Sequence, residues 1–342
     1  MSIETARTPA FLLTGFLGSG KTTLLNAALR TPALANTAVV VNELGEIGLD
    51  QLVIAQATDN VVLLDAGCLC CANTGALHET LADLVHRRAR GELPPFERVI
   101  IETSGVADPA PLLHVLLGHP LVTGDYRLEA VVCAVDAQHF LQSREQHAEL
   151  DKQAAMADRI AITKRDLADP GPVLQLLRGL NPEADLVDSI PEIFASNTRT
   201  RKPIRSLATL GPIKPHGRGS SIRAYSFRPP APVTWAGWAA WSRLVGAEFG
   251  ARLLRVKGLL RMEDTGEIAL VQGVQGVFHP PQRFRDWPDA GTAGEQGNRL
   301  VCIARDLDEA QLRATLPALA AEAGTQARYS IHDLQQKRQA ET

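Results

Sequence analysis

The sequence lacks a membrane-spanning apolar run, a signal-peptide cleavage site and an excess of one sign of charge. No apolar run approaches the roughly 20 residues that a helix needs to cross a bilayer, and the apolar stretch at residues 11–17 leads into a glycine-rich turn, not a cleavage site. Neither sign of charge is in excess, because 35 Lys and Arg face 38 Asp and Glu, a net charge of −3. We therefore expect a cytoplasmic protein whose main partner is neither a membrane nor a nucleic acid.

A framework of disulfides is also not expected. The chain has five cysteines, and three of them, Cys68, Cys70 and Cys71, stand within four positions, unlike the cysteines of a small secreted protein. Cys133 and Cys302 lie in apolar runs, where a buried and unreactive thiol is expected. The clustered thiols predict metal or redox chemistry instead.

The order of apolar runs predicts an α/β domain followed by a smaller α+β domain. With 342 residues the chain is long enough for about two domains. Up to about residue 197, short β-branched or apolar runs alternate with helical patterns, which is typical of a mostly parallel sheet covered by helices on both faces. A Gly-, Pro- and Ser-rich stretch predicts a linker at 211–221, so the expected domains are 1–210 and 222–342.

The expected elements follow from these runs. In the first domain the expected strands are Ala10–Thr14, Ala38–Val41, Val61–Leu64, Arg98–Ile101, Ala130–Val135 and Arg159–Thr163. The expected helices there are Lys21–Leu29, Leu77–Arg90, Ala110–Leu117, Gln138–Met156 and Gly171–Leu180. In the second domain we expect strands Ile222–Arg228, Leu253–Met262, Ile268–Phe278 and Leu300–Ala304, with helices at Trp235–Phe249 and from Glu309. Three tryptophans at helical spacing predict core packing, and the basic strand residues Arg252, Arg255, Lys257 and Arg261 predict a solvated sheet face.

The strongest motif follows the first expected strand. Residues 15–22, GFLGSGKT, fit G-x-x-x-x-G-K-[ST] and lie between a strand and a helix, where a phosphate-binding loop has to lie. Its glycines, Gly15, Gly18 and Gly20, let backbone N–H groups point at phosphate oxygens. Lys21 is expected to neutralise the β- and γ-phosphates, as a candidate catalytic residue, and the Thr22 hydroxyl to ligate Mg²⁺.

Two later strand ends supply candidates for the metal ion and the base. Glu102 is a candidate for holding Mg²⁺ through water and for catalysis, with a capping or loop carboxylate as the alternative, and Gly105 can offer its amide to the γ-phosphate. Lys164 and Asp166 follow a strand in a pattern close to Asn-Lys-x-Asp, in which one carboxylate accepts both N–H donors of guanine. Thr163 replaces the Asn. A solvated loop is the alternative interpretation of Lys164 and Asp166.

The cysteine cluster follows the expected strand at 61–64. Three soft sulfurs suit Zn²⁺, Co²⁺ or Cu⁺, yet they are one ligand short of a closed four-coordinate site. An incomplete site can exchange its ion. Redox-sensing thiols and buried structural cysteines are the alternatives.

The order and spacing of these motifs, together with Asn42–Glu46, resemble the CobW family of P-loop GTPases, which are metal chaperones with a Cys-x-Cys-Cys motif between two switch segments. Residues 255–258, with the strands that follow them, resemble the C-terminal domain of that family. The resemblance implies that Asn42–Glu46 form the first switch. It also implies phosphate and Mg²⁺ binding by Gly18–Thr23, with Ser19 and Thr23 among them, guanine binding by Lys164 and Asp166, and transition-metal binding by Cys68, Cys70 and Cys71.

The predicted function is that of a GTPase that binds zinc or cobalt and delivers it to a client protein when GTP is hydrolysed to GDP and phosphate. A homo-oligomer is compatible with the sequence. Two departures from the family pattern leave the metal open. Many relatives have a Glu at the place of Val41, and many zinc-linked members have a His-rich loop, whereas the nine histidines of this chain are scattered. His119 has the place of a metal-linked His of some relatives, but a surface turn residue is expected there. The alternative functions are an ATP-using small-molecule kinase on the same scaffold and a non-enzymatic interaction module with a structural zinc.

Overall fold

The computed structural model describes residues 7–41, 61–65, 74–196, 221–229, 232–287 and 297–320. The segment Asn42–Glu46 and the cysteine motif lie outside these residues. The chain divides into two units, of which the first comprises Met1–Arg178 and Ala184–Asn197 and the second the remaining residues. The predicted linker 211–221 lies outside the described residues except for Ser221, so the predicted domain boundary stays a prediction.

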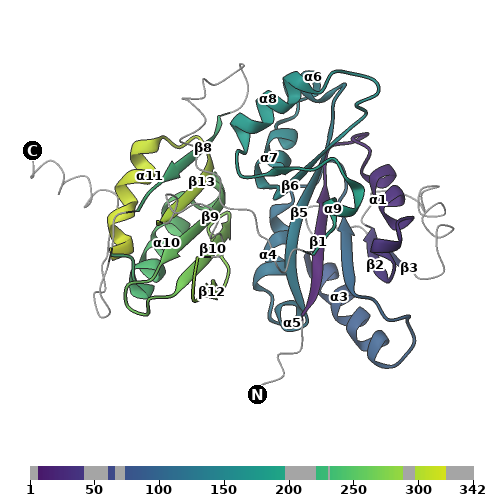
Figure 1. Ribbon diagram of the computed structural model, residues 1–342, viewed down its shortest axis with the longest axis horizontal. Coiled ribbons are helices and arrows are strands. Elements are labelled where there is room, and N and C mark those ends of the chain that lie inside the picture. The colour runs from purple at the N-terminus through teal and green to yellow at the C-terminus, as the bar shows by residue number, and fades with distance from the viewer. Residues whose placement is uncertain are drawn as a thin grey trace, which may run out of the picture. The chain divides into compact units, whose positions relative to one another are not determined.

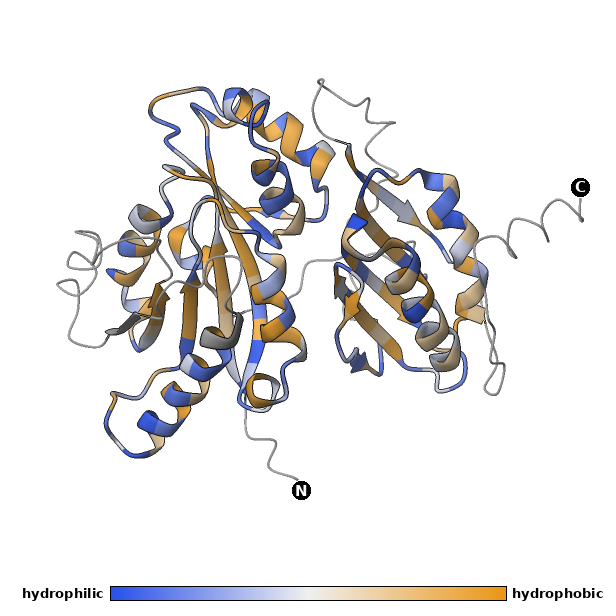
Figure 2. Cartoon of the chain, turned by 180° about the vertical axis from the view of Figure 1, so that it is seen from behind, coloured by the Kyte–Doolittle hydropathy of each residue, from blue (hydrophilic) through white to orange (hydrophobic). Residues whose placement is uncertain are grey.

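The first unit is built on a seven-stranded sheet with the order β3-β2-β4-β1-β5-β6-β7, in which every neighbouring pair is parallel (Figure 1). Its strands are β1 (Thr8–Thr14), β2 (Thr37–Val41), β3 (Val61–Asp65), β4 (Arg98–Glu102), β5 (Tyr126–Asp136), β6 (Arg159–Thr163) and β7 (Asp185–Leu186). Strands that are buried on both faces are apolar along nearly their whole length, and Figure 2 shows this for the central strands. The predicted parallel sheet is confirmed.

Helices cover both faces of this sheet. They are α1 (Lys21–Leu29), α3 (Thr74–Ala89), α4 (Ala110–Gly118), α5 (Pro120–Thr123), α6 (Phe140–Ser143), α7 (Ala148–Met156), α8 (Gly171–Leu180) and α9 (Ile190–Ile193), with the 3-10 turn η1 (Pro32–Leu34). On one face, Leu25 and Leu29 of α1 and Ile193 of α9 pack against Phe11 and Val39 of the strands. Helices α4 and α7 lie on the other face (Figure 1).

The single helix predicted over Gln138–Met156 is wrong, because the chain leaves the helical conformation between α6 and α7. His147, directly before α7, has an extended backbone with φ −130° and ψ 98°. Arg144 makes two hydrogen bonds to the carboxylate of Asp151, of 2.8 and 2.7 Å, and both side chains are at most 12% exposed. This buried ion pair closes the turn between the helices.

The second unit is a six-stranded antiparallel sheet with the order β11-β10-β9-β13-β8 and with β12 paired to β10. Its elements are β8 (Ile222–Phe227), α10 (Trp235–Phe249), η3 (Gly250–Arg252), β9 (Leu253–Arg261), β10 (Ile268–Val274), β11 (Val277–Phe278), β12 (Gln282–Phe284), β13 (Arg299–Arg305), α11 (Glu309–Thr315) and η4 (Leu316–Ala320). Trp238 and Trp241 of α10 are buried in the core, and Trp235 packs against it. The predicted α+β unit and the packing role of the tryptophans are confirmed.

Two local predictions for this unit are wrong. The strand predicted over Ile268–Phe278 is a hairpin, because Gln275 and Gly276 both have positive φ (47° and 79°) and bring Val274 opposite Val277. Arg255 does not lie on a solvated face, since only 3% of the residue is exposed.

Candidate nucleotide-binding site

The loop between β1 and α1, Gly15–Thr22, is called the P-loop here, and its backbone depends on glycine. Gly15, Gly18 and Gly20 have φ values of 144°, 69° and 84°. A Cβ atom on Gly15 would lie only 2.5 Å from the carbonyl O of Ala134 on β5, so no larger residue fits there. Gly20 directly precedes α1, so the positive end of the helix dipole faces the loop. This arrangement suits an anion such as a phosphate group.

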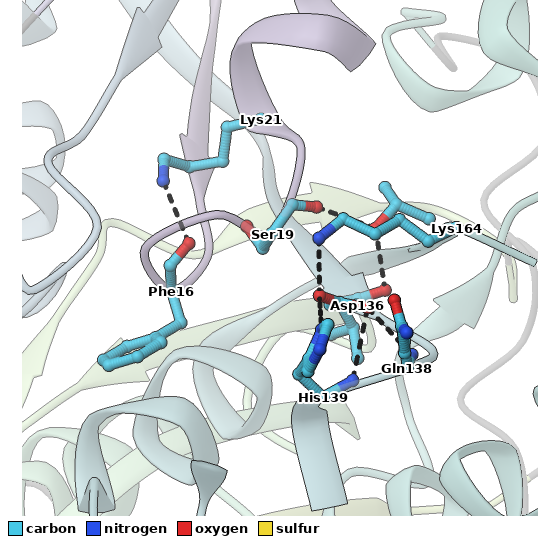
Figure 3. Close-up of polar contacts among 9 residues, drawn as sticks. Phe16, Ser19, Lys21, Asp136, Gln138, His139 and Lys164 are labelled. Atoms are coloured by element: carbon cyan, nitrogen blue, oxygen red, sulfur yellow. Dashed lines mark hydrogen bonds and ion pairs between the residues drawn. The ribbon is translucent and has the colours of Figure 1, made fainter. Parts of the chain in front are cut away.

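Lys21 and Thr22 begin α1, and their polar ends contact the P-loop and β4, respectively. The Nζ atom of Lys21, a residue that is 8% exposed, donates to the carbonyl O of Phe16 at 3.2 Å (Figure 3). The Thr22 hydroxyl donates to Oε1 of Glu102 at 2.8 Å. Glu102 is 1% exposed and ends β4, in register with Leu13 of β1. A hydroxyl and a carboxylate are hard oxygen ligands of the kind that Mg²⁺ prefers, so this pair fits a magnesium ion.

The backbone after β4 lies against the P-loop. A Cβ atom on Gly105 would lie 2.6 Å from the backbone N and 2.8 Å from Cα of Leu17, so the two segments touch. The side chain of Gln153, on α7, donates from Nε2 to the carbonyl O atoms of Gly105 and Ala107, both at 3.1 Å. The Gly105 backbone is therefore held between the P-loop and α7.

The end of β6 is joined to the P-loop and to β5. Thr163 donates from its hydroxyl to the carbonyl O of Ser19 at 2.7 Å. Lys164, with a φ of 54°, donates from Nζ to Oδ2 of Asp136 at 2.7 Å (Figure 3). Asp166 lies on the exposed turn that follows. Lys164 is thus fixed in orientation, while the Asp166 carboxylate is accessible.

Asp136, the last residue of β5, holds Lys164 in place. Its side chain is 10% exposed and also accepts hydrogen bonds from the Gln138 N–H at 2.8 Å and from the His139 ring at 3.0 Å. Burial alone raises the pKa of Asp136, but the hydrogen bonds from Lys164, His139 and Gln138 outweigh burial, and its pKa lies below the usual value. The carboxylate is therefore charged and can pair with Lys164 at neutral pH.

The structure brings the predicted nucleotide-site residues to the carboxyl ends of the strands, at one edge of the sheet. Glu102 ends β4, and the residues that follow β1, β4 and β6 are Gly15, Gly18, Ser19, Gly20, Lys21, Thr22, Thr23, Gly105, Lys164 and Asp166. Thr23 is exposed. The proposed metal ligands Cys68, Cys70 and Cys71 lie outside the described residues, so their role stays a prediction.

Three residues with contacts in the site were missed from the sequence. Asp136 could have been found, because it ends an apolar strand at the edge where the P-loop lies. His139 and Gln153 lie within expected helical sequence, and no local pattern marks them. His119 lies in the turn between α4 and α5, as expected, but it is partly buried, and the centroid of its ring lies 4.2 Å from that of His78.

The two remaining cysteines behave as expected. Cys133, on β5, and Cys302, on β13, are each 1% exposed. Burial raises the pKa of both thiols to about 12. Both are protonated at neutral pH and are poor nucleophiles and metal ligands.

These features together define a P-loop nucleotide-binding protein, and comparison with known families makes the assignment specific. The family "CobW/HypB/UreG, nucleotide-binding domain" matches residues 9–188, and "Cobalamin synthesis protein cobW C-terminal domain" matches residues 222–320. The chain therefore belongs to the CobW/HypB/UreG family.

Its relatives span nearly the same length. The chain is 29% identical to the zinc chaperone YjiA of Escherichia coli, over 90% of this chain and 97% of that protein. It is 26% identical to zinc-regulated GTPase metalloprotein activator 1 of Saccharomyces cerevisiae, over 80% of this chain and 76% of that protein. The crystal structure of Zn(II)-bound YjiA GTPase from E. coli superposes with a TM-score of 0.68 at 27% identity, over 93% of this chain and 100% of that one. The family, the fold and the P-loop motif together identify this chain as a P-loop GTPase.

No helix in the described part of the chain has both the length and the apolar character needed to span a membrane.

Proposed function

We propose that this chain is a GTP-dependent metal chaperone, which binds a transition metal ion and passes it to a client protein when GTP is hydrolysed. Zinc is the first candidate for the ion and cobalt the second. The proposed metal ligands are Cys68, Cys70 and Cys71. The P-loop supports the nucleotide part of this function, and the similarity to a protein named as a zinc chaperone supports the metal part.

The observation that carries the proposal is the register of β2, β3 and β4. Asp65, the last residue of β3, pairs with Val41 of β2, and Val41 pairs on its other side with Glu102. Adjacent strands are about 4.8 Å apart, so β3 ends about 10 Å from the strand that carries Glu102. Cys68 comes three residues after Asp65. The chain therefore enters the cysteine motif from a point close to the proposed magnesium site.

In this proposal the P-loop holds the phosphates of GTP. Lys21 neutralises the β- and γ-phosphates, and Gly105 offers its amide to the γ-phosphate. Ser19 and Thr23 are proposed to bind phosphate together with the glycines of the loop. Thr22 and Glu102 would hold Mg²⁺, which when bound neutralises charge on the phosphate oxygens. Lys21 and Glu102 are the proposed catalytic residues, because they act on the phosphate chain and its metal ion.

The base end of the site rests on Lys164 and Asp166. The accessible carboxylate of Asp166 can accept both N–H donors on the edge of guanine. The Lys164 stem, held by Asp136, can lie along the face of the ring. Adenine lacks the adjacent donor pair, so this arrangement favours GTP over ATP.

The nucleotide controls the metal through the segments that border the γ-phosphate. When the γ-phosphate leaves, the Gly105 amide loses its hydrogen-bond partner, so the segment around Gly105 is one proposed switch. The segment Asn42–Glu46 after β2 is the second. A change in either alters the surroundings of the cysteine motif and lowers its affinity for the ion. The coupling must be reciprocal, so the metal tightens GTP binding by the factor by which GTP tightens metal binding.

A zinc titration in defined nucleotide states tests the proposal. Competition with a chromophoric chelator gives the zinc affinity with Mg²⁺ and a non-hydrolysable GTP analogue, with GDP, or without nucleotide. We expect binding with the analogue to be tighter than with GDP by a factor of about 5 or more. Equal affinities in all three states contradict the proposal. Cys70→Ser should weaken zinc binding, and Cys302→Ser, at a buried thiol of the second unit, should leave it unchanged.

The rival functions give different results in the same assays. For an ATP-using kinase, ATP competes as well as GTP, and Asp166→Ala does not change the preference. For a module with a structural zinc, chelation unfolds the protein. We expect instead a preference for GTP that Asp166→Ala removes, and a chelated protein that still binds GDP.

A further inference from the structure

Gln153 links α7 to the backbone that follows β4. The residue is 1% exposed, and its Nε2 atom makes two buried hydrogen bonds, to the carbonyl O atoms of Gly105 and Ala107. Gly105 in turn touches Leu17 of the P-loop, since a Cβ atom there would lie 2.6 Å from the Leu17 backbone N. One side chain thus fixes the position of the Gly105 backbone beside the P-loop.

Helix α7 contacts the same region at two further points. Lys152, the neighbour of Gln153, forms an ion pair with Asp108, whose other carboxylate oxygen accepts from the Ala110 N–H at 3.0 Å. The ring of His147, directly before α7, lies 4.7 Å from the ring of Phe16 in the P-loop. Helix α7 therefore holds residues 105–108, called the 105–108 segment below, and the residue before the helix contacts the P-loop.

A small cavity lies between Gln153 and the P-loop. Its volume is about 20 Å³, and Leu17, Ser19, Cys133 and Gln153 are among the residues that line it. The hydroxyl O of Ser19 and the Oε1 atom of Gln153 are both buried, and neither has a hydrogen-bond partner within the described parts of the chain. Buried polar atoms nearly always find a partner, and this volume suits one water molecule. Such a water can donate to Gln153 Oε1 and bond to the Ser19 hydroxyl.

We propose that Gln153 is a positioning residue that couples the P-loop to the 105–108 segment. Its amide N–H groups fix the Gly105 backbone, and its amide oxygen is linked through a water in the cavity to Ser19. The inference rests on the proposed function, in which the Gly105 amide meets the γ-phosphate. Because GDP has no γ-phosphate, Gln153 matters for the binding of GTP and not for that of GDP.

The test is Gln153→Leu in the full chain, which keeps a side chain of similar size and removes both donors. Affinities for GDP and for a non-hydrolysable GTP analogue are measured by titration in the presence of Mg²⁺. We expect the affinity for the analogue to fall about tenfold and that for GDP to stay within about twofold. A purely structural role would weaken both equally, and that result, or no change in either, overturns the inference. Gln175→Leu, at an exposed position of α8, is the matched control and should change neither.

Two further measurements keep the test decisive. If Gln153→Leu does not fold, Gln153→Met removes the same donors with a more flexible side chain, and hydrogen exchange reports the amides of the 105–108 segment. With the GTP analogue bound, we expect faster exchange there than in the wild type, and equal exchange overturns the inference. Failure of the proposed function looks different, because the wild-type chain itself would then not prefer the GTP analogue over an ATP analogue.

A double-mutant cycle tests the water link. Ser19→Ala and Gln153→Leu should each weaken binding of the GTP analogue, and the double variant should weaken it by less than the product of the two factors, because both remove the same link. Effects that multiply without coupling overturn the link through the cavity.

Discussion

The hydroxyl of Thr163 donates a hydrogen bond of 2.7 Å to the carbonyl O of Ser19, which joins the end of β6 to the P-loop. Thr163 has the place of the Asn in the Asn-Lys-x-Asp pattern, so the departure from that pattern still provides a polar contact with the phosphate-binding backbone. The residues that follow, Lys164 and Asp166, are the proposed base-binding pair. This hydrogen bond therefore adds a direct link between the phosphate end and the base end of the site, beside the pairing of β1, β5 and β6 in the sheet.

Removing that hydroxyl should loosen the P-loop. Thr163→Val keeps the branched shape and leaves the Ser19 carbonyl without its donor. We expect the free energy of unfolding to fall by about 1 kcal/mol, and GDP affinity to fall by a factor of about 5, an effect of similar size. Thr163→Ser keeps the hydroxyl and should bind GDP nearly as well as the wild type. Denaturant unfolding measures the unfolding free energy, and nucleotide titration measures the GDP affinity. Equal GDP affinity in Thr163→Val and Thr163→Ser would rule out a role of the hydrogen bond to Ser19 in nucleotide binding.

Neutralising Asp136 should release Lys164. Asp136→Asn removes the charge that Lys164 and His139 contact, at 2.7 and 3.0 Å. Because Lys164 is partly exposed, we expect a loss of about 1 kcal/mol of unfolding free energy at pH 7, together with weaker GDP binding. Asp125→Asn, at an exposed aspartate of the same unit, is the control and should change neither quantity.

The same variant has a predictable pH dependence. The pKa of Asp136 is lower in the folded protein than its usual value. Its contribution to stability is therefore fully present above the unfolded pKa of about 3.9 and is lost as the pH falls through the lower folded pKa. The difference in unfolding free energy between wild type and Asp136→Asn should shrink as the pH falls below about pH 4. A difference that grows as the pH falls from about 4 to 2 would show that the sign is wrong.

How far the sequence predicts this molecule depends on whether the signal is local. The helix Lys21–Leu29 has the predicted bounds because a P-loop motif and an apolar stripe both begin there. The break within Gln138–Met156 could not be predicted, because it rests on the Arg144–Asp151 pair, and both residues are compatible with a continuous helix. Likewise, the turn at Gln275–Gly276 lies within an apolar run that is typical of one strand.

The candidate site shows the same division. Residues in contiguous motifs, such as Lys21 and Thr22, were found because the chemistry of phosphate binding needs them at fixed spacing. Gln153 was not found, because it contacts Gly105, which is 48 residues away, and only the packing of α7 against β5 brings them together. Contacts of that kind are properties of the tertiary structure and leave no local pattern.

The second unit allows a test of packing that is separate from the nucleotide site. A Cβ atom on Gly237 in α10 would lie 1.8 Å from the carbonyl O of Leu319 in η4. Gly237→Ala should therefore push η4 away and destabilise this unit by about 3 kcal/mol. Gly118→Ala, in α4 where no atom lies within 4 Å of the added Cβ, is the control and should be close to neutral. Denaturant unfolding measures the loss of unfolding free energy. If Gly237→Ala lowers the unfolding free energy as little as Gly118→Ala does, the close contact between α10 and η4 is refuted.

The magnesium site can be tested by removing one charge from Glu102. Glu102→Gln keeps an oxygen that can accept the hydrogen bond from the Thr22 hydroxyl, now 2.8 Å long. The neutral amide is a much poorer ligand for Mg²⁺ than a carboxylate, whether the ion is bound directly or through water. We expect the Mg²⁺ concentration needed for half-maximal binding of the GTP analogue to rise about tenfold or more, a loss of about 1.4 kcal/mol.

Magnesium-free GDP binding separates this effect from damage to the fold. Because the P-loop backbone and Lys21 are unchanged in Glu102→Gln, the variant should bind GDP without Mg²⁺ about as well as the wild type. Glu97→Gln changes the same chemical group just before β4, where the side chain is 69% exposed, and should leave the Mg²⁺ dependence unchanged. If Glu102→Gln lowers GDP affinity equally with and without Mg²⁺, then Glu102 supports the loop structure through Thr22 and does not hold the ion.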